Sequence, residues 1–204
     1  MALPKASDRR FTYADYLKWP DDERWELIDG ESHALSPAPT ISHQTLVLNI
    51  GKQIDDALEG TPCRALIAPV DVLLPNPDEA DDQVTTVVQP DILVVCDAKK
   101  ITERNVRGAP DWIIEVLSAA TARHDHLTKR AIYERAGVRE YWLVHPVDQV
   151  ITVYTLQDGH YGRPEITDMA GERAPTIFPG IVIRWQPMLD KLPDDGPLPQ
   201  EEPT

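Results

Sequence analysis

The feature that most constrains this chain is a carboxylate set inside an apolar stretch. In "PDWIIEVLS", residues 110–118, Glu115 has large apolar residues on both sides. If the stretch is a strand, alternation puts Glu115 on one face with Ile113 and Leu117, and the opposite face is apolar as well. Burying a charged carboxylate there is costly unless something compensates it. The stretch therefore predicts a partner for Glu115: a metal ion, an Arg or Lys side chain, or a proton.

A second carboxylate stands at the head of another apolar run. In "VVQPDILVVCDAKK", residues 87–100, Asp91 lies 24 residues before Glu115. If the two strands pair, the two carboxylates can converge on one cation. Two carboxylates with a backbone carbonyl and waters form a usual environment of Mg²⁺ in phosphate chemistry. The alternative is that each carboxylate meets a helix N-terminus or an arginine.

Composition places the chain among globular proteins. Hydrophobic residues make up 42% and charged residues 26% of the sequence. No apolar run approaches the roughly 20 residues of a membrane span, and the N-terminal stretch has no apolar core of the signal-peptide type, so a cytoplasmic protein is expected. The two cysteines, Cys63 and Cys96, are predicted to be buried thiols in a reducing compartment, not a disulfide or a metal site.

The charge distribution suggests one domain followed by a tail. The net charge is −14, which argues against a protein that coats nucleic acid non-specifically. We expect a single domain over residues 1–190 and a disordered acidic, Pro-rich tail over 191–204. Residues 99–139 contain nine Lys and Arg against five Asp and Glu. This locally basic segment could meet a phosphate backbone, or it could be a solvated helix face.

Apolar periodicity and turn signals predict a mixed α+β protein, with a mixed sheet flanked by at least two helices. The expected elements are a short helix ended by Pro20, a hairpin around Asp29–Gly30, a helix from a cap at Ser42 to Gly60, an extended stretch over 63–75, single strands over 85–96 and 110–118, a helix over 125–137, and strands over 139–146, 149–161 and 180–189.

"QPD" at residues 89–91, the interval to Glu115 and this order of elements resemble the PD-(D/E)XK nuclease superfamily, which has the restriction-endonuclease-like fold. More closely, the chain is similar to a bacterial branch of restriction-endonuclease-like proteins of unknown function. The matching segments cover about residues 11–160 and are "WELIDGE", "SHQ", "QPDILVV", "GAPDWIIEVLS", "KRAIYERAGVREYWLV" and "VYTLQDGHY". The resemblance implies a core sheet with extra C-terminal strands. It also implies Mg²⁺ or Mn²⁺ held by Asp91 and Glu115, with the Val116 carbonyl as a third ligand.

One departure from the superfamily pattern affects catalysis. The lysine of the motif should stand two residues after the glutamate, and this chain has Leu117 there. In the similar branch the following helix supplies the lysine, which makes Lys129 the candidate. Asp125, Lys129 and Tyr133 follow one another at four-residue spacing on a predicted helix. The alternative is an exposed Asp–Lys pair of little energetic weight.

Three upstream residues are further candidates. His43 begins a predicted helix and matches the family's histidine, so it could support a metal ligand or carry a proton; it could also be structural. Glu31, just past the hairpin turn, matches an acidic position of the family and could enlarge the metal site, or it could be an edge-strand charge. Asp71, in "PVDVLL", alternates with apolar neighbours as Glu115 does.

The leading hypothesis is a metal-dependent endonuclease that hydrolyses DNA phosphodiester bonds, with Asp91 and Glu115 on the metal and Lys129 and His43 assisting. The alternative is a catalytically lapsed protein of this fold that binds DNA or a protein partner, as Leu117 and the negative charge suggest. A third possibility is that the acidic tail binds a partner. The family's habit suggests a homodimer, and no membrane association is expected. The sequence has no P-loop, G-x-G-x-x-G, zinc-type Cys/His pairs or G-x-S-x-G motif.

Overall fold

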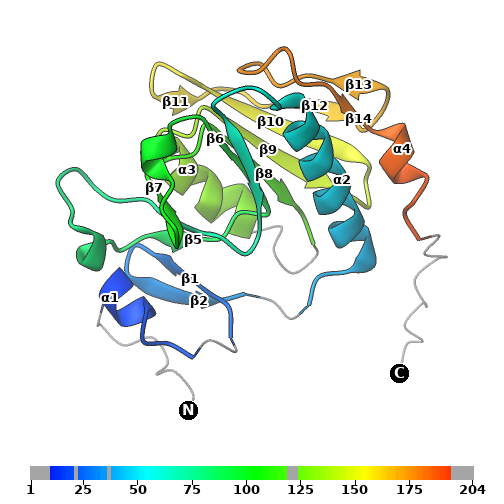
Figure 1. Cartoon of the computed structure of the whole chain (residues 1–204). Coiled ribbons are helices and arrows are strands. Elements are labelled where there is room, and N and C mark those ends of the chain that lie inside the picture. The colour runs from blue at the N-terminus through cyan, green and yellow to red at the C-terminus, as the bar shows by residue number, and fades with distance from the viewer. Residues whose placement is uncertain (1–9, 21–22, 36–37, 119–123, 194–204) are drawn as a thin grey trace, which may run out of the picture.

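The strand that carries the buried carboxylate, β8, lies inside the larger of two mixed sheets (Figure 1). The computed structural model describes residues 10–20, 23–35, 38–118 and 124–193, with residues 124–126 described by their backbone alone. The strands described are β1 Trp25–Ile28, β2 Glu31–Ala34, β3 Arg64–Ile67, β4 Asp71–Leu73, β5 Val87–Val88, β6 Ile92–Val95, β7 Asn105–Arg107, β8 Trp112–Val116, β9 Glu140–His145, β10 Val150–Gln157, β11 His160–Tyr161, β12 Glu165–Asp168, β13 Glu172–Arg173 and β14 Ile183–Arg184. The helices are α1 Tyr13–Tyr16, α2 Ile41–Ala57, α3 Arg130–Ala136 and α4 Gln186–Leu189, with short 3₁₀ or π segments η1 Asp81–Gln83, η2 Ala98–Lys100 and η3 His124–Lys129.

The larger sheet has the order β11-β10-β9-β8-β6-β3, with β12 also paired to β10. Only the β8–β9 pair in it is parallel. Helix α2 covers one face and α3 the other (Figure 1). Trp112, Ile114 and Val116 enter the core under α2, whereas Ile113 and Leu117 enter the core under α3. The predicted alternation along this strand is therefore confirmed, and so is the mixed α+β class.

Helix α2 begins two residues earlier than the sequence pattern predicted. The cap is Thr40, whose side chain accepts a hydrogen bond from the His43 backbone N–H at 3.2 Å, so the predicted cap at Ser42 was wrong. The apolar face of α2 packs on the large sheet through Leu46, Val47, Ile50 and Ile54. This packing fixes the first turn of the helix, and His43 with it, over one end of β6 and β8.

The smaller sheet has the order β2-β1-β5-β4-β7. The predicted hairpin is confirmed: β1 and β2 are antiparallel, and Asp29 and Gly30 both have positive φ, 48° and 84°. The predicted single strand over 85–96 was wrong, because β5 and β6 belong to different sheets. Pro90 separates them; it has no N–H to give to a ladder. Asp91 thus lies at the junction of the two sheets.

The predicted helix over 125–137 is confirmed in outline, with one difference in its winding. Its first part, η3, is a π-helix, and regular α-helix begins only at Arg130. Gly137, with φ 89°, ends it as predicted. A π-helix turns less per residue than an α-helix, so the four-residue stacking assumed for this segment does not describe the residues up to Lys129.

The C-terminal region contains the predicted extra strands, with two errors. The stretch over 149–161 is not one strand but a hairpin of β10 and β11, which turns at Asp158 and Gly159. The stretch over 180–189 is not one strand either. Only β14 is extended, and it pairs with β13 outside both larger sheets. The chain then turns into α4, which has Pro187 in its first turn. Trp185 and Met188 from this region are buried against the α2 side of the core.

The prediction that both cysteines are free thiols was wrong. Cys63 precedes β3 and Cys96 follows β6, and the antiparallel register Arg64↔Val95 sets the two cysteines opposite each other. They form a disulfide. The spacing of 33 residues hides this pairing, because only the strand register brings the two side chains together. Among the helices of the described ranges, none is long and apolar enough to cross a membrane.

Candidate active site

The pairing of β6 with β8 brings Asp91 and Glu115 together. The register Ile92↔Ile114 makes Asp91 and Glu115 the next pair along the antiparallel ladder. The Asp91 backbone N–H donates to Glu115 Oε2 at 3.2 Å, and the Val116 N–H donates to Asp91 Oδ2 at 2.9 Å. The strand pairing that the sequence argument took as a condition is therefore present. Backbone amides hold the two carboxylates in place across the strand ends.

Glu115 is almost fully buried, with 4% of its side chain exposed. Its Oε1 atom accepts hydrogen bonds from Lys129 Nζ at 3.0 Å and from the Tyr133 hydroxyl at 2.9 Å. Both donors come from the helical segment that covers this face of the sheet. An ammonium and a phenol thus offset the cost of burying this carboxylate. The partner that the sequence predicted for Glu115 is therefore present.

Lys129 has a second carboxylate partner that the sequence analysis did not select. Lys129 Nζ lies 3.1 Å from Glu26 Oε1, and both side chains are buried. The same Glu26 oxygen accepts the backbone N–H of Gln89 at 2.8 Å. One ammonium therefore lies between two buried carboxylates, from β1 and β8. The signal was present in "WELI", where Glu26 is flanked by apolar residues much as Glu115 is.

His43 reaches the carboxylate pair from α2. Its Nε2 lies 3.1 Å from Asp91 Oδ2, and the two side chains are 12% and 19% exposed. His43 therefore points from α2 towards the sheet and supports a candidate metal ligand, one of the roles considered for it. Its other ring nitrogen, Nδ1, is buried and makes no hydrogen bond with any residue that the structure describes. Asp91 and His43 are the part of the cluster nearest to solvent.

The position where the superfamily has its lysine carries no polar group here. Leu117 is buried in the core under α3, so Lys129 is the ammonium that contacts Glu115. The neighbouring Val116 backbone faces Asp91 through its N–H. Because the N–H and C=O of one strand residue point to the same edge of the strand, the Val116 carbonyl opens on the Asp91 side as well.

Two of the proposed site residues lie elsewhere. Glu31 is exposed at the start of β2, opposite Ile28, and makes no hydrogen bond or ion pair with a described residue. Asp71 is half-buried and accepts hydrogen bonds from the Tyr16 hydroxyl and from Gln89 Nε2, both at 2.9 Å. Burial, and then the Asp71 charge, raise the pKa of the Tyr16 hydroxyl above its usual range, so this phenol stays protonated. The side chain of Asp125 lies outside the described part of the chain.

The charges of the cluster suit a divalent cation. Counting only the described side chains, Glu26, Asp91 and Glu115 against Lys129 leave a formal charge of −2 when His43 is neutral. Within the described ranges, no group of three or more His, Cys, Asp or Glu side chains is placed so that these side chains alone could hold a metal ion. Mg²⁺ is often held by only one or two carboxylates together with waters and substrate phosphates. The oxygen donors at Asp91, Glu115 and Val116 fit that chemistry.

A mixed sheet with a carboxylate pair at adjoining strand ends and a buried lysine beside it defines a restriction-endonuclease-like protein. The chain belongs to the Uma2 family, described as "Putative restriction endonuclease", which matches residues 13–186. A solved structure from Anabaena variabilis, described as a putative nuclease belonging to DUF820, is similar in fold: the TM-score is 0.69 at 20% sequence identity, over 88% of this chain and 98% of that one. No curated protein matches the chain.

Proposed function

We propose that this protein is a divalent-metal-dependent endonuclease that hydrolyses phosphodiester bonds of DNA. The observation that supports this most is the Asp91–Glu115 pair, held by backbone amides and bonded to the buried Lys129. Membership of the nuclease-like Uma2 family supports the same chemistry. A structural salt bridge would need only one carboxylate for one lysine, whereas this cluster contains an excess of negative charge next to a partly exposed Asp91.

Asp91, Glu115 and the Val116 carbonyl would hold Mg²⁺ or Mn²⁺. When bound, such a metal supplies a water of lowered pKa and a positive charge for the developing phosphoryl oxygens. Lys129, already in contact with Glu115, would position the attacking water or donate to a phosphoryl oxygen. His43, whose Nε2 contacts Asp91, would hold that carboxylate in position for the metal. Glu31, exposed at the start of β2, lies outside this cluster.

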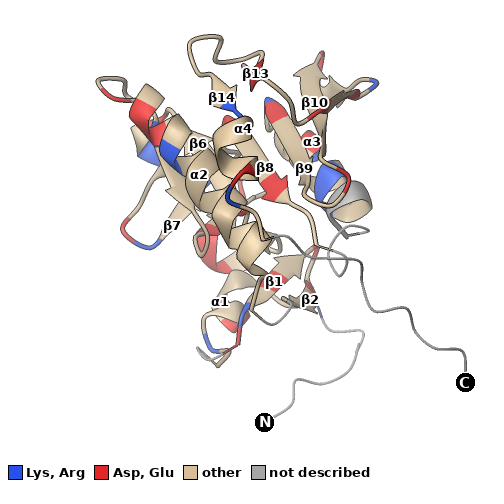
Figure 2. Ribbon diagram, turned by 90° about the vertical axis from the view of Figure 1, so that its right-hand side faces the viewer, with Lys and Arg blue, Asp and Glu red and all other residues tan. Residues whose placement is uncertain are grey.

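The protein's own charge gives a reason for metal dependence. The chain has 34 acidic and 20 basic residues, and Figure 2 shows basic residues spread over several elements, not gathered on one face. The cluster itself has a formal charge of −2. A phosphate approaching it is repelled until a divalent cation has bound. Cleavage should therefore depend on metal concentration, with negligible activity after chelation.

A plasmid-cleavage assay in Mg²⁺ and in Mn²⁺ tests the proposal. Wild-type protein should nick or linearise the plasmid, and Asp91→Ala and Glu115→Gln should lower the rate by a factor of 100 or more, as losses of catalytic groups commonly do, on the order of 10²–10⁴. Asp148→Asn, an exposed change of equal charge, serves as the matched control and should cut normally. Equal cutting by Asp91→Ala would show that the activity is a contaminant or arises elsewhere.

A second candidate is a protein of this fold that binds DNA or a protein partner without cutting. It is favoured by two observations: both oxygens of Glu115 already accept hydrogen bonds from protein donors, and Leu117 stands where the motif has its lysine. Metal binding separates the two candidates. A nuclease should gain thermal stability in millimolar Mg²⁺ or Mn²⁺, because a ligand of the folded state raises the melting temperature. For a binding-only protein, the metal should raise the melting temperature of the wild type no more than it raises that of the Asp91→Ala variant.

We also propose that the protein acts as a homodimer, because cutting both strands of a duplex requires two active sites. Sedimentation at micromolar concentration tests this. A single species at the 22.9 kDa mass of one chain would refute it.

A further inference from the structure

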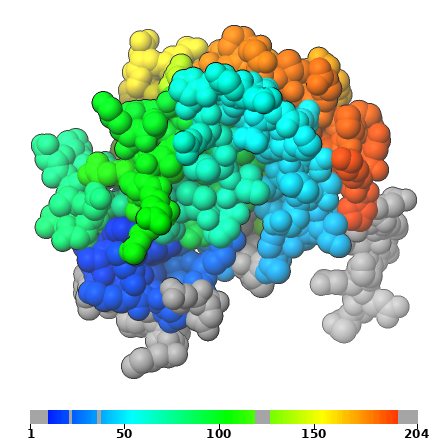
Figure 3. Space-filling view, viewed as in Figure 1, coloured from blue at the N-terminus to red at the C-terminus, as the bar shows by residue number. Residues whose placement is uncertain are grey.

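A cavity of about 410 Å³ lies beside the candidate active site. Its walls are residue 66 and residues 69–71 on one side, residues 101–106 on the other, and Gln89 at the base. Figure 3 shows the two wall segments next to each other on the face in view, the first in cyan to blue-green and the second in bright green. Small-molecule sites commonly have volumes of about 300–1,000 Å³, so the cavity is large enough for one nucleotide unit.

The cavity is joined to the carboxylate pair by short backbone links. Gln89 stands two residues before Asp91, and its own N–H is bonded to Glu26. On the other wall, the Ala68 N–H donates to the Asp91 carbonyl at 2.9 Å, and Pro69 follows directly. Two extended residues span about 7 Å, so the cavity begins roughly one nucleotide away from Asp91.

The walls combine apolar faces with an available acceptor. Leu66, Pro69 and Ile101 provide apolar surface. Asp71 uses Oδ1 for the Tyr16 hydroxyl and for Gln89 Nε2, while Oδ2 accepts no hydrogen bond from a described residue. An ionised carboxylate only accepts, so the available oxygen selects a ligand with an N–H or O–H group.

A positive group stands at the rim of the same cavity. Arg104 is exposed, and its guanidinium makes no ion pair or hydrogen bond with any residue in the described ranges. Arginine matches phosphate oxygens in charge and geometry. A flat ligand with an amino group on one side and a phosphate on the other satisfies the apolar walls, Asp71 and Arg104 together.

We infer that this cavity receives an unstacked nucleobase bearing an exocyclic amino group, from the DNA strand whose phosphate lies at Asp91 and Glu115. The inference rests on the proposed nuclease function and adds a base preference to it. Asp71 Oδ2 accepts the amino group of cytosine, adenine or guanine, and Arg104 binds a neighbouring phosphate. An unpaired thymine offers only its N3–H, which lies between two carbonyl oxygens that repel a carboxylate, so it is disfavoured. The base must leave its stack to enter, which favours single-stranded or flipped substrate.

Binding of labelled 12-nucleotide oligomers of dA, dC and dT, followed by fluorescence anisotropy with Ca²⁺ in place of Mg²⁺ or Mn²⁺, tests the base preference separately from cleavage. Wild-type protein should bind dA and dC about 2- to 10-fold more tightly than dT, the worth of one hydrogen bond. Asp71→Asn keeps Oδ1 for Tyr16 and Gln89 but replaces Oδ2 by an amide that donates. It should lose this preference or reverse it.

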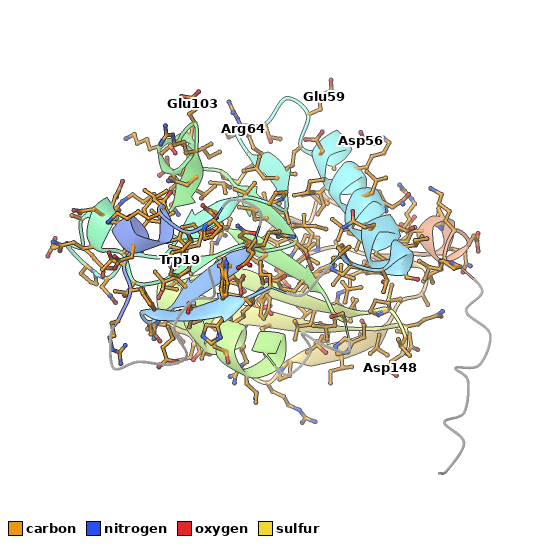
Figure 4. All side chains as sticks on the ribbon, turned by 90° about the horizontal axis from the view of Figure 1, so that it is seen from below. Trp19, Asp56, Glu59, Arg64, Glu103 and Asp148 are labelled. Carbon is orange, nitrogen blue, oxygen red and sulfur yellow. A yellow bond between two sulfur atoms is a disulfide. The ribbon has the colours of Figure 1, made fainter. Side chains whose placement is uncertain are left out.

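The matched control is Asp148→Asn, which makes the same change of charge. Figure 4 shows Asp148 on the opposite side of the molecule from Glu103, a residue of the cavity wall. This variant should keep the wild-type order of affinities. Equal binding of all three oligomers by wild-type protein overturns the inference, and so does an unchanged preference in Asp71→Asn.

Arg104→Gln gives an independent test if Asp71→Asn does not fold. Loss of one phosphate contact should weaken binding of all three oligomers by a similar factor and reduce the slope of log K against log salt by about 1. Unchanged affinity and slope refute the role of Arg104. The plasmid assay is read separately. If no plasmid is cut but dA and dC are bound more tightly than dT, the nuclease proposal fails and the base site stands. If the plasmid is cut but no oligomer is preferred, the nuclease proposal stands and the base site fails.

Discussion

Replacing Lys129 by methionine is the most informative single change in this protein. Met fills a similar volume but removes the ammonium that lies 3.0 Å from Glu115 and 3.1 Å from Glu26. Both carboxylates are buried, so neither can recover its lost partner from bulk water. Breaking a buried ion pair by removing one member typically costs about 3–5 kcal/mol. Because two buried carboxylates lose the same ammonium, we expect the upper part of that range.

The assay is equilibrium unfolding in urea at pH 7, with thermal melting as a second measure. For a chain of 150–250 residues, each kcal/mol corresponds to about 2–4 °C, so Lys129→Met should melt roughly 10–20 °C below wild type. The double variant Lys129→Met with Glu26→Gln should recover part of the lost stability, because it removes one of the two carboxylates that Lys129 contacts in the wild type.

Two results would refute this reasoning. A loss below about 1 kcal/mol in Lys129→Met would mean that the carboxylates are neutralised by something other than this lysine. If Glu26→Gln lowers stability as much in the Lys129→Met background as it does in the wild type, then Glu26 and Lys129 do not interact. The exposed change Lys52→Met, which removes one helix-surface ion pair, serves as the control and should cost only a few tenths of a kcal/mol.

Tyr133→Phe removes a hydrogen bond to the Glu115 carboxylate and should cost about 1.5–3 kcal/mol in urea unfolding; a neutral effect would show that Lys129 alone satisfies that oxygen. Burial raises the pKa of Glu140, so the native state retains a proton that the unfolded state releases, and stability should fall as the pH rises above the ordinary carboxyl pKa. Glu140→Gln should flatten that fall in unfolding curves measured from pH 4 to 7, and an unchanged pH profile contradicts it. Reducing the Cys63–Cys96 disulfide, which closes a loop of 33 residues, should lower stability by about 3–4 kcal/mol, seen as a lower urea midpoint with dithiothreitol; Cys63→Ser, already without the bond, should not respond.

The local patterns of this sequence were sufficient to single out the two carboxylates of the site. A run of apolar residues interrupted by one carboxylate has few physical solutions, so a buried partner for Glu115 could be predicted, whereas the pairing of its strand with that of Asp91 was only a condition. Sequence patterns also selected His43 as a candidate, although they placed the start of its helix two residues too late. The identity of the neutralising group was less determined, since a metal, an arginine and a lysine all remained possible until Lys129 was placed.

What could not be predicted depends on contacts between distant segments. Glu26 has the same apolar flanks as Glu115, but its role follows from lying opposite a lysine more than 100 residues away. The break between β5 and β6 results from Pro90, yet only the sheet order shows that the chain changes sheets there. The disulfide follows from a strand register, which residue spacing does not determine.

The lysine that touches Glu115 comes from a different segment of the chain, not from the strand itself. A gene divided between Leu117 and Lys129 would therefore encode two fragments with complementary defects. The first would contain Glu26, Asp91 and Glu115 without their ammonium, and the second would contain the ammonium without any of those carboxylates. Neither fragment could be complete by itself, and any restored cutting would report their reassembly. Under the proposed nuclease function, the two fragments would form a split reporter in which each supplies one side of the Lys129 ion pairs.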